Sequence, residues 1–379
     1  MKLNSALTSR TSNSETKWML EGRYFSSDQV FSEEKSHIFS KHWVNVGRAE
    51  KIASAGDYFL TSVADESLIV LRNRNHELRA YYNICRHRGT RLCEAERGST
   101  AGSISCPYHG WTYDLDGQLL AARAMQTVPG FKKDNFQLHK VAAEEWEGSI
   151  FVNLDTHPKP LQETISGLAA KVLGYELPEL RIARTIEYDV QANWKLIIQN
   201  YSECYHCPII HPALERLSSS QSGVNDMLNG PVIGGYSTLK KGVASLTLTG
   251  QAAASQLENL PVADLNRIYY YVIFPNTLLS MHADYVMVHT MQPKSPNRTL
   301  ISCEWLFHPK TLAQPSFNSH EAVEFWDITN RQDWKVNELT QAGVSSRAYQ
   351  PGPYAGAHED LLHRFDQEYL QAMGSSTEF

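Results

Sequence analysis

The sequence lacks the features that define several large classes of protein. Its longest apolar run, near Tyr269 to Pro275, is far shorter than the roughly 20 residues that a membrane-spanning helix needs. The first residues contain no apolar stretch of signal-peptide length. Only six cysteines occur in 379 residues, too few for a disulfide framework. We therefore expect a cytoplasmic globular protein whose cysteines are reduced.

Basic side chains are also in the minority. The chain has 35 Lys and Arg against 41 Asp and Glu, a net charge of −6, and it contains no long basic block. This balance argues against a surface for nucleic acid or for an anionic membrane. A hydrophobic content of 42% is ordinary for a globular protein, and the length is enough for two domains or for one large domain with an insertion.

Hydrophobic periodicity and turn signals divide the chain into three parts. Residues 27–43 favour a helix that Ser27 or Asp28 caps. Short β-rich runs separated by turns predict a small all-β domain over residues 44–156. Residues 157–379 mix helices and strands.

The third part ends in two predicted helices, at about residues 319–341 and 358–373, which a Gly/Pro-rich link joins. Residues 218–261 are rich in Gly, Ser and Leu, and we interpret them as a loop insertion.

Two mixed pairs of cysteine and histidine stand at the ends of predicted strands in the β-rich part. Cys85 and His87 form the first pair, and Cys106 and His109 follow after an 18-residue gap. Two thiolates on one iron and two imidazoles on the other hold a [2Fe–2S] cluster of raised reduction potential. A structural zinc site is the alternative, but such sites usually pair like ligands. Cys93 fits neither pair, and we interpret it as a buried thiol.

A second group of candidate ligands lies in the segment ECYHCPIIH, residues 203–211. Two histidines and one carboxylate leave positions open on iron, as in the facial triad of non-heme Fe(II) sites. A regular helix would turn His206 and His211 about 140° apart, so we expect Pro208 and Pro212 to break the helix and let both imidazoles converge. The alternative is a pair of ordinary, partly buried histidines.

These motifs resemble those of the Rieske non-heme iron oxygenases. The segments ICRHRG (84–89) and CPYHGWTY (106–113) resemble the Rieske signature, and the likeness extends from about Tyr24 to Tyr354. The resemblance implies an α+β fold and a homotrimer. It divides the chain into a small all-β Rieske domain at residues 44–156 and a helix-grip catalytic domain made of residues 1–43 and 157–379.

The resemblance also places a third iron ligand, an aspartate, on a C-terminal helix. The stretch NRQDW, residues 330–334, matches that region and points to Asp333, with Asp327 and Asp360 as alternatives.

In the family, the acid at the position of Glu203 bridges the two metal centres during electron transfer. Glu203 precedes His206 by three residues, one helical turn, and the resemblance implies that it hydrogen-bonds this imidazole and a cluster histidine of the neighbouring chain. The spacing of Asn200 differs by one residue from that of a family asparagine, so no role is carried over to it.

A glutamate at position 203 is similar to the oxygenases that act on carnitine and glycine betaine. The resemblance therefore implies a terminal oxygenase component that receives electrons from NAD(P)H through a flavin and iron–sulfur reductase. With O₂ it would hydroxylate and N-demethylate a small quaternary ammonium compound. One alternative is an aromatic ring-hydroxylating dioxygenase, and another is a Rieske electron-transfer protein without mononuclear iron.

Aromatic faces bind quaternary ammonium ions well, although most aromatic residues are simply core. The candidates from family position are Tyr201, Tyr205, Tyr236, Tyr285, Trp305 and Phe307. His282 and His289 lie on one predicted strand, and they either line the substrate pocket or are ordinary histidines.

Overall fold

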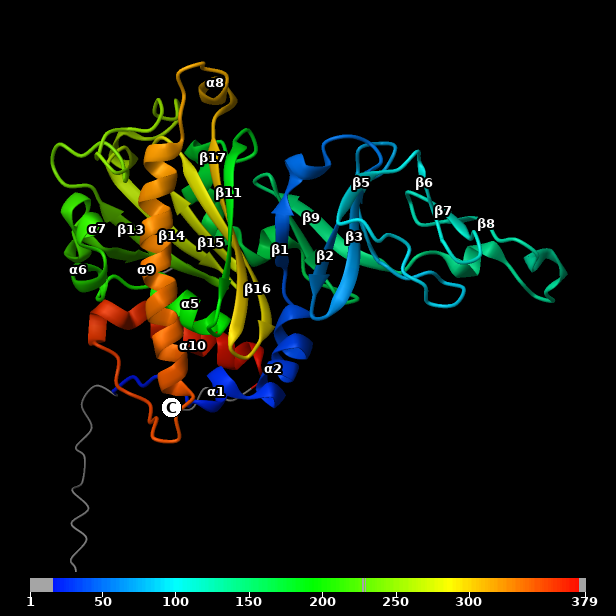
Figure 1. Cartoon of the computed structure of the whole chain (residues 1–379), viewed down its shortest axis with the longest axis horizontal. Coiled ribbons are helices and arrows are strands. Elements are labelled where there is room, and N and C mark those ends of the chain that lie inside the picture. The colour runs from blue at the N-terminus through cyan, green and yellow to red at the C-terminus, as the bar shows by residue number, and fades with distance from the viewer. Residues whose placement is uncertain (1–15, 227, 229, 375–379) are drawn as a thin grey trace, which may run out of the picture.

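A computed structural model describes residues 16–226, 228 and 230–374, which form two lobes of an elongated molecule (Figure 1). No helix in these ranges is long and apolar enough to cross a membrane.

The smaller lobe is all-β. A seven-stranded antiparallel sheet has the strand order β1-β10-β9-β4-β3-β2-β5, and a three-stranded sheet has the order β6-β7-β8. Buried side chains of the first sheet, such as Ile69 and Tyr81, share one core with Tyr113 of the second and with Trp111, which precedes β7. The strands are β1 (Val44–Arg48), β2 (Asp57–Val63), β3 (Glu66–Arg72), β4 (Leu78–Tyr82), β5 (Arg97–Ser99), β6 (Ser103–Ser105), β7 (Thr112–Asp114), β8 (Leu119–Ala121), β9 (Lys140–Trp146) and β10 (Ser149–Asn153).

The larger lobe is built around a second seven-stranded antiparallel sheet, of order β11-β17-β16-β15-β14-β13-β12. Its central strand β15 is buried at every residue, in keeping with its apolar sequence TLLSM. The strands are β11 (Arg181–Val190), β12 (Val224–Asp226), β13 (Val232–Thr238), β14 (Arg267–Ile273), β15 (Thr277–Met281), β16 (Val286–Ser295) and β17 (Arg298–Phe307).

A long helix, α9 (His320–Val344), crosses one face of this sheet (Figure 1). Ala322, Phe325 and Trp326 are buried on it, at the spacing of an apolar helical stripe. Together the two lobes confirm the predicted α+β class. The other α-helices are α1 (Arg23–Ser26), α2 (Asp28–Glu34), α3 (Leu161–Thr164), α4 (Ser166–Val172), α5 (Trp194–Tyr201), α6 (Cys207–Ile210), α7 (Pro212–Leu217), α8 (Pro309–Leu312) and α10 (Asp360–Ala372).

The N-terminal helices pack on the larger lobe through a buried polar cluster. The Glu34 carboxylate forms an ion pair with Lys195 and accepts hydrogen bonds from Trp194 Nε1 (2.9 Å) and the Tyr369 hydroxyl (2.8 Å). Because a buried charge is costly without partners, these contacts tie the start of the chain to α5 and α10.

Two predictions about local structure need correction. The helix expected at 27–43 is α2, which Ser27 caps as predicted, and it continues as a π-helix over Lys35–Phe39 before the chain turns into β1. Residues 218–261 are not only a loop, because β12 and β13 add two strands to the sheet edge. A Cβ on Gly234 would lie 2.0 Å from Tyr270 O, and one on Gly235 would lie 2.0 Å from Val224 O. The glycines that suggested a loop instead allow close strand contacts.

Candidate metal centres

The four cluster ligands predicted from the sequence lie on two similar turns of the smaller lobe. Cys85 follows β4, and Cys106 follows β6. The amide of Gly89 donates to Cys85 O, and the amide of Gly110 donates to Cys106 O, both at 3.0 Å. Both glycines have positive φ angles, +77° and +71°, which favour glycine at these positions. Each turn thus presents one thiol and one imidazole.

The side chains of these turns fit a cluster with mixed ligands. Cys85 and Cys106 are buried and free of disulfides, and the rings of His87 and His109 are 4.7 Å apart. The His87 ring stacks on Trp111 at 4.8 Å, and its Nδ1 atom is buried without a hydrogen-bond partner in the described part of the chain. An orphaned ring nitrogen beside two buried thiols is the donor set that a [2Fe–2S] cluster with two Cys and two His ligands uses.

A second group of ligand atoms comes together in the larger lobe. His211 Nε2 lies 2.7 Å from Asp333 Oδ1, and His206 Nε2 lies 3.2 Å from His211 Nε2 and 3.3 Å from Asp333 Oδ1. Three atoms bound at right angles to one metal ion at ~2.1 Å would be about 3.0 Å apart. These three residues therefore fit one face of an octahedral iron site.

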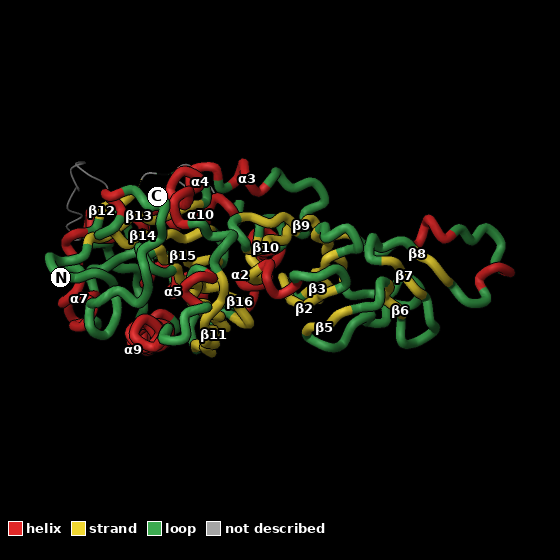
Figure 2. The backbone as a smooth tube through the Cα atoms, turned by 90° about the horizontal axis from the view of Figure 1, so that it is seen from above, coloured by secondary structure: helices red, strands yellow, loops and turns green. Residues whose placement is uncertain are grey.

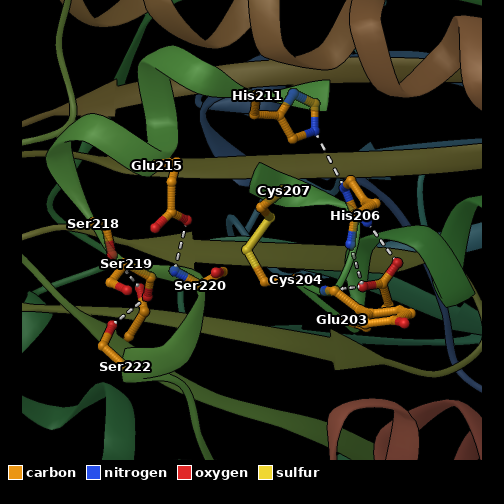
Figure 3. Close-up of a disulfide and its surroundings, with 12 residues drawn as sticks. Glu203, Cys204, His206, Cys207, His211, Glu215, Ser218, Ser219, Ser220 and Ser222 are labelled. Atoms are coloured by element: carbon orange, nitrogen blue, oxygen red, sulfur yellow. Dashed lines mark hydrogen bonds and ion pairs between the residues drawn. A yellow bond between two sulfur atoms is a disulfide. The ribbon is translucent and has the colours of Figure 1, made fainter. Parts of the chain in front are cut away.

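The backbone conformation between the two histidines explains how their side chains converge. Helix α6 ends at Ile210, His211 adopts φ −120° and ψ 64°, and Pro212 begins α7. A regular helix cannot continue through this conformation, so the expected break occurs at His211 and both imidazoles face each other (Figure 3).

Glu203 contacts His206 as expected, but not from a helix. Helix α5 ends at Tyr201, and Glu203 lies in the turn before α6. Its Oε1 atom accepts a hydrogen bond from His206 Nδ1 at 2.5 Å, and its Oε2 atom accepts from the amides of Tyr205 and His206. The turn, rather than helical spacing, brings the two side chains together.

Each histidine thus has an acceptor on the ring nitrogen that faces away from the ligand group. Glu203 serves His206, and Gln332 Oε1 accepts from His211 Nδ1 at 2.7 Å. These contacts leave both Nε2 atoms as donors to a metal. The sequence motifs did not predict this role of Gln332, although the residue is adjacent to Asp333. Asn200, to which no role was assigned, has its Nδ2 atom 3.5 Å from His206 Nε2.

The electrostatics of the group favour a bound cation. Burial by itself would lower the pKa of His206, but hydrogen bonds to Asp333 and Glu203 raise it to about 10. Burial would raise the pKa of Asp333, but hydrogen bonds from His206 and His211 hold it below its usual value. Two carboxylates thus stabilise positive charge at this point.

The alternative acids are engaged elsewhere. Asp327 accepts a hydrogen bond from the Tyr188 hydroxyl at 2.7 Å and pairs with Arg331. Asp360 pairs with Lys17 at 2.7 Å. Neither lies in the group that His206 and His211 form with Asp333.

A cavity of about 610 Å³ lies beside this group, a size typical of small-molecule sites. Three of the predicted aromatic residues line it, namely Tyr201, Tyr205 and Tyr236. The other three, Tyr285, Trp305 and Phe307, are buried outside its lining. Further lining aromatics that the sequence did not single out are Tyr270, Trp326 and Trp334. Their place in the wall depends on β14 and α9 meeting in space, which no local pattern shows.

The wall of the cavity also contains a disulfide between Cys204 and Cys207 (Figure 3). Reduced cysteines were expected, so this bond is a departure from the sequence prediction. It is a local link between residues three apart rather than a framework, and the remaining four cysteines are free.

Comparisons with known proteins find two family models that match this chain. Residues 42–132 match the family model for the Rieske [2Fe-2S] domain, and residues 177–375 match that for the ring hydroxylating alpha subunit (catalytic domain).

The chain also resembles individual oxygenase subunits. It is 30% identical to the glycine betaine monooxygenase oxygenase subunit of Chromohalobacter salexigens, over 92% of this chain and 84% of that protein. It is 38% identical to the carnitine monooxygenase oxygenase subunit of Escherichia coli, over 53% of this chain and 54% of that protein. Among solved structures, the quaternary ammonium Rieske monooxygenase CntA in complex with gamma-butyrobetaine superposes with a TM-score of 0.78. That likeness has 25% identity and covers 94% of this chain and 95% of that one.

Proposed function

Because the chain belongs to the Rieske oxygenases with a ring hydroxylating alpha-subunit catalytic domain, we propose that it is the terminal oxygenase component of a multicomponent system. Its reaction would be the O₂-dependent hydroxylation and N-demethylation of a small, betaine-like quaternary ammonium compound. The observation that carries this proposal is the cavity itself, in which aromatic rings lie beside the His206–His211–Asp333 group. The relatives that act on glycine betaine and carnitine support the same substrate class.

The proposal assigns a role to each ligand set. Cys85, His87, Cys106 and His109 would hold the [2Fe–2S] cluster, and His206, His211 and Asp333 would hold Fe(II). When bound, the iron supplies the activation of O₂ with electrons that the cluster stores. The chain's own contribution is to orient the ligands through Glu203 and Gln332 and to hold the substrate among aromatic side chains, away from bulk water.

The two ligand sets lie far apart within one chain, which supports an assembly in which the cluster of one subunit faces the iron site of another, and we propose that this assembly is a homotrimer. Strands β6 and β7 lie in the smaller lobe, toward one end of the molecule, and α7 lies near the other end in both views; Figure 1 shows α6 beside α7 (Figures 1 and 2). A cyclic arrangement would place the cluster turns of one subunit against α6 of the next. Tyr205 and Ile209, 60% and 83% exposed beside His206, supply a surface for that contact.

Glu203 would then bridge the two centres across the subunit boundary. Its carboxylate already accepts from His206 Nδ1, and its side chain is 11% exposed, so part of it reaches the surface. A carboxylate between two imidazoles forms a charge-assisted hydrogen bond to each.

The remaining partners follow from the same proposal. The system would take electrons from NAD(P)H through a separate flavin and iron–sulfur reductase, in the cytoplasm. The Rieske domain would comprise residues 44–156, and residues 1–43 and 157–379 would form the catalytic domain, in keeping with the contacts of Glu34 to α5 and α10.

The second candidate function is that of an aromatic ring-hydroxylating dioxygenase. The match to the catalytic domain of ring hydroxylating alpha subunits and the aromatic cavity wall favour this function. A Rieske electron-transfer protein is disfavoured, because such a protein needs no second group of metal ligands like His206, His211 and Asp333.

A substrate screen with the complete system tests the proposal. Purified protein with a compatible reductase and NADH is offered trimethylglycine, carnitine, choline, benzoate and indole. We expect NADH oxidation that depends on a quaternary ammonium compound, with one formaldehyde released per demethylation. Formation of cis-diols from the arenes, without formaldehyde from any N-methyl compound, would favour the dioxygenase instead.

A further inference from the structure

The cavity wall contains a histidine whose ring makes no hydrogen bond. His289 lies on β16 and lines the cavity, and its side chain is 1% exposed. Neither ring nitrogen has a partner in the described ranges of the chain. Its neighbours in the wall are aromatic, with the rings of Tyr201 and Trp334 at 6.4 Å and 6.3 Å.

An unpartnered imidazole in such a place is costly. Burial of a polar group without a hydrogen bond is unfavourable, so most buried polar groups find partners. Burial lowers the pKa of His289 to about 4, more than the nearby Asn330 and Asp333 side chains raise it. The ring is therefore neutral near pH 7, with one N–H to donate and one nitrogen to accept.

The turn between β15 and β16 provides a contrast. His282 is also 1% exposed and also lacks partners on both ring nitrogens, but it does not line the cavity. Its ring stacks on Tyr285 at 4.1 Å, inside the core. His282 is a packing residue, whereas the ring of His289 belongs to the cavity wall, beside Tyr201 and Trp334.

Among the ionisable side chains of the wall, few can donate a hydrogen bond to a ligand oxygen. No Lys or Arg lines the cavity in the described part of the chain. Glu203 and Asp333 accept hydrogen bonds from the two histidine ligands, and Asp360 pairs with Lys17. His358 also lines the cavity, but it is exposed and stacks on the exposed ring of Tyr205. His289 is thus the buried ionisable nitrogen group that the proposed metal site does not use.

We propose that His289 recognises the oxygen of the substrate's polar end, a hydroxyl or a carboxylate, by donating a ring N–H to it. The aromatic rings of the cavity would hold the ammonium group at the other end. His289 would therefore be a specificity-determining residue, which orients the molecule so that an N-methyl group faces the ligand group. This inference rests on the proposed function and deepens it, because it states how the site tells one quaternary ammonium compound from another.

Binding calorimetry on the intact, metal-loaded protein tests this inference without turnover. The probes are trimethylglycine, with a carboxylate, choline, with a hydroxyl, and tetramethylammonium, with no oxygen. The variants are His289→Phe, which keeps a ring but loses both nitrogens, and His289→Gln, which keeps a donor. His282→Phe, in the turn before β16, is the matched control. Each variant is compared only after its cluster absorption and melting temperature match those of wild type.

In His289→Phe we expect the Kd of one or both oxygen-bearing probes to rise by about tenfold or more, while that of tetramethylammonium changes by less than about twofold. His289→Gln should recover most of the lost affinity, and His282→Phe should bind all three like wild type. The probe that loses affinity shows whether the recognised oxygen is a hydroxyl or a carboxylate.

Two other results have distinct meanings. If wild type binds the probes but His289→Phe weakens all three equally or none of them, the His289 inference is wrong and the proposed function stands. If wild type binds none of the three and oxidises no N-methyl compound, the proposed substrate class is wrong and the inference falls with it.

Discussion

Gln332 Oε1 lies 2.7 Å from His211 Nδ1, which fixes the imidazole of a proposed iron ligand from the opposite side. The next residue on α9, Asp333, contacts Nε2 of the same ring at 2.7 Å. One turn of α9 therefore supplies both a proposed iron ligand, Asp333, and the side chain that orients His211, which is Gln332. Since an orienting hydrogen bond sets the tautomer and basicity of a ligand, Gln332 should influence iron affinity without touching iron.

Replacing Gln332 by Leu should lower the affinity of the mononuclear site for Fe(II) by about 10- to 100-fold, because the His211 ring loses the acceptor that orients it. Gln332→Glu keeps an acceptor and should bind iron nearly as well as wild type. Competition with a chelator, followed by iron analysis, measures both. Equal affinity of Gln332→Leu and wild type would show that packing alone orients His211.

Asp333→Ala should lose the mononuclear iron and all oxygenation while keeping the cluster spectrum, since His206 and His211 alone leave the ligand set incomplete. The controls are Asp360→Ala and Asp327→Ala, which remove the alternative acids. Iron analysis should give about two irons per chain in Asp333→Ala and about three in both controls. If a control variant loses this iron and Asp333→Ala retains it, the acid replaced in that control is the third iron ligand and Asp333 is not.

Cys85→Ser and His109→Ala should abolish the visible absorption of the Rieske cluster and leave Fe(II) binding at the other site intact. The physical reason is that each removes one of four cluster ligands, whereas the second site lies in the larger lobe. Cys93→Ser is the matched control, because this buried thiol belongs to neither turn. A native spectrum in both ligand variants would rule out the assigned cluster.

Glu203→Gln should slow electron transfer by orders of magnitude in an assembled protein with a normal cluster spectrum and near-normal iron. Glutamine keeps the size but places an NH₂ group where an acceptor for one imidazole is needed. Rapid mixing of reduced protein and substrate with O₂, followed by cluster absorption, measures the effect. Glu215→Gln on α7, whose carboxylate accepts from the Ser220 amide at 2.8 Å, is the control. Reoxidation of Glu203→Gln at the wild-type rate would make Glu203 a structural acid.

Asp284 should make stability depend on pH. Burial raises its pKa to about 6, although hydrogen bonds from Ser245 and the Ala253 amide lower it. An unfolded Asp ionises near pH 4, so the folded state holds more protons between about pH 4 and 6, and stability falls as pH rises through this window. Relative to Asp284→Asn, the free energy of unfolding of wild type should fall by about 1 kcal/mol between pH 5 and pH 8.

Urea denaturation at several pH values measures this difference. Asp189→Asn should show no such trend, because the hydrogen bond from Arg298 holds the pKa of this exposed carboxylate below its usual value, so it stays ionised between pH 5 and pH 8. A difference between wild type and Asp284→Asn that stays constant from pH 5 to pH 8 would show that Asp284 is ionised throughout.

The sequence by itself determined the chemistry of the two ligand sets. Coordination depends on residue type and on short spacings, so the Cys85/His87 and Cys106/His109 pairs and the His206–His211 segment were recognisable without a structure. Asp333, separated from His211 by 122 residues, was found only through resemblance to a family. The α+β class followed from periodicity, which is also a local property.

The tertiary structure decided what depends on packing between distant segments. Glycines at 234 and 235 suggested a loop, because the neighbouring strands that require them are far away in sequence. The cavity wall joins β13, β14, β16 and α9, so the roles of Gln332, Trp326 and His289 emerged only when these elements met. The separation of the two ligand sets into different lobes is likewise a property of the whole fold (Figure 1). Spacing along the chain sets which atoms can bind a metal, whereas long-range packing sets what surrounds it.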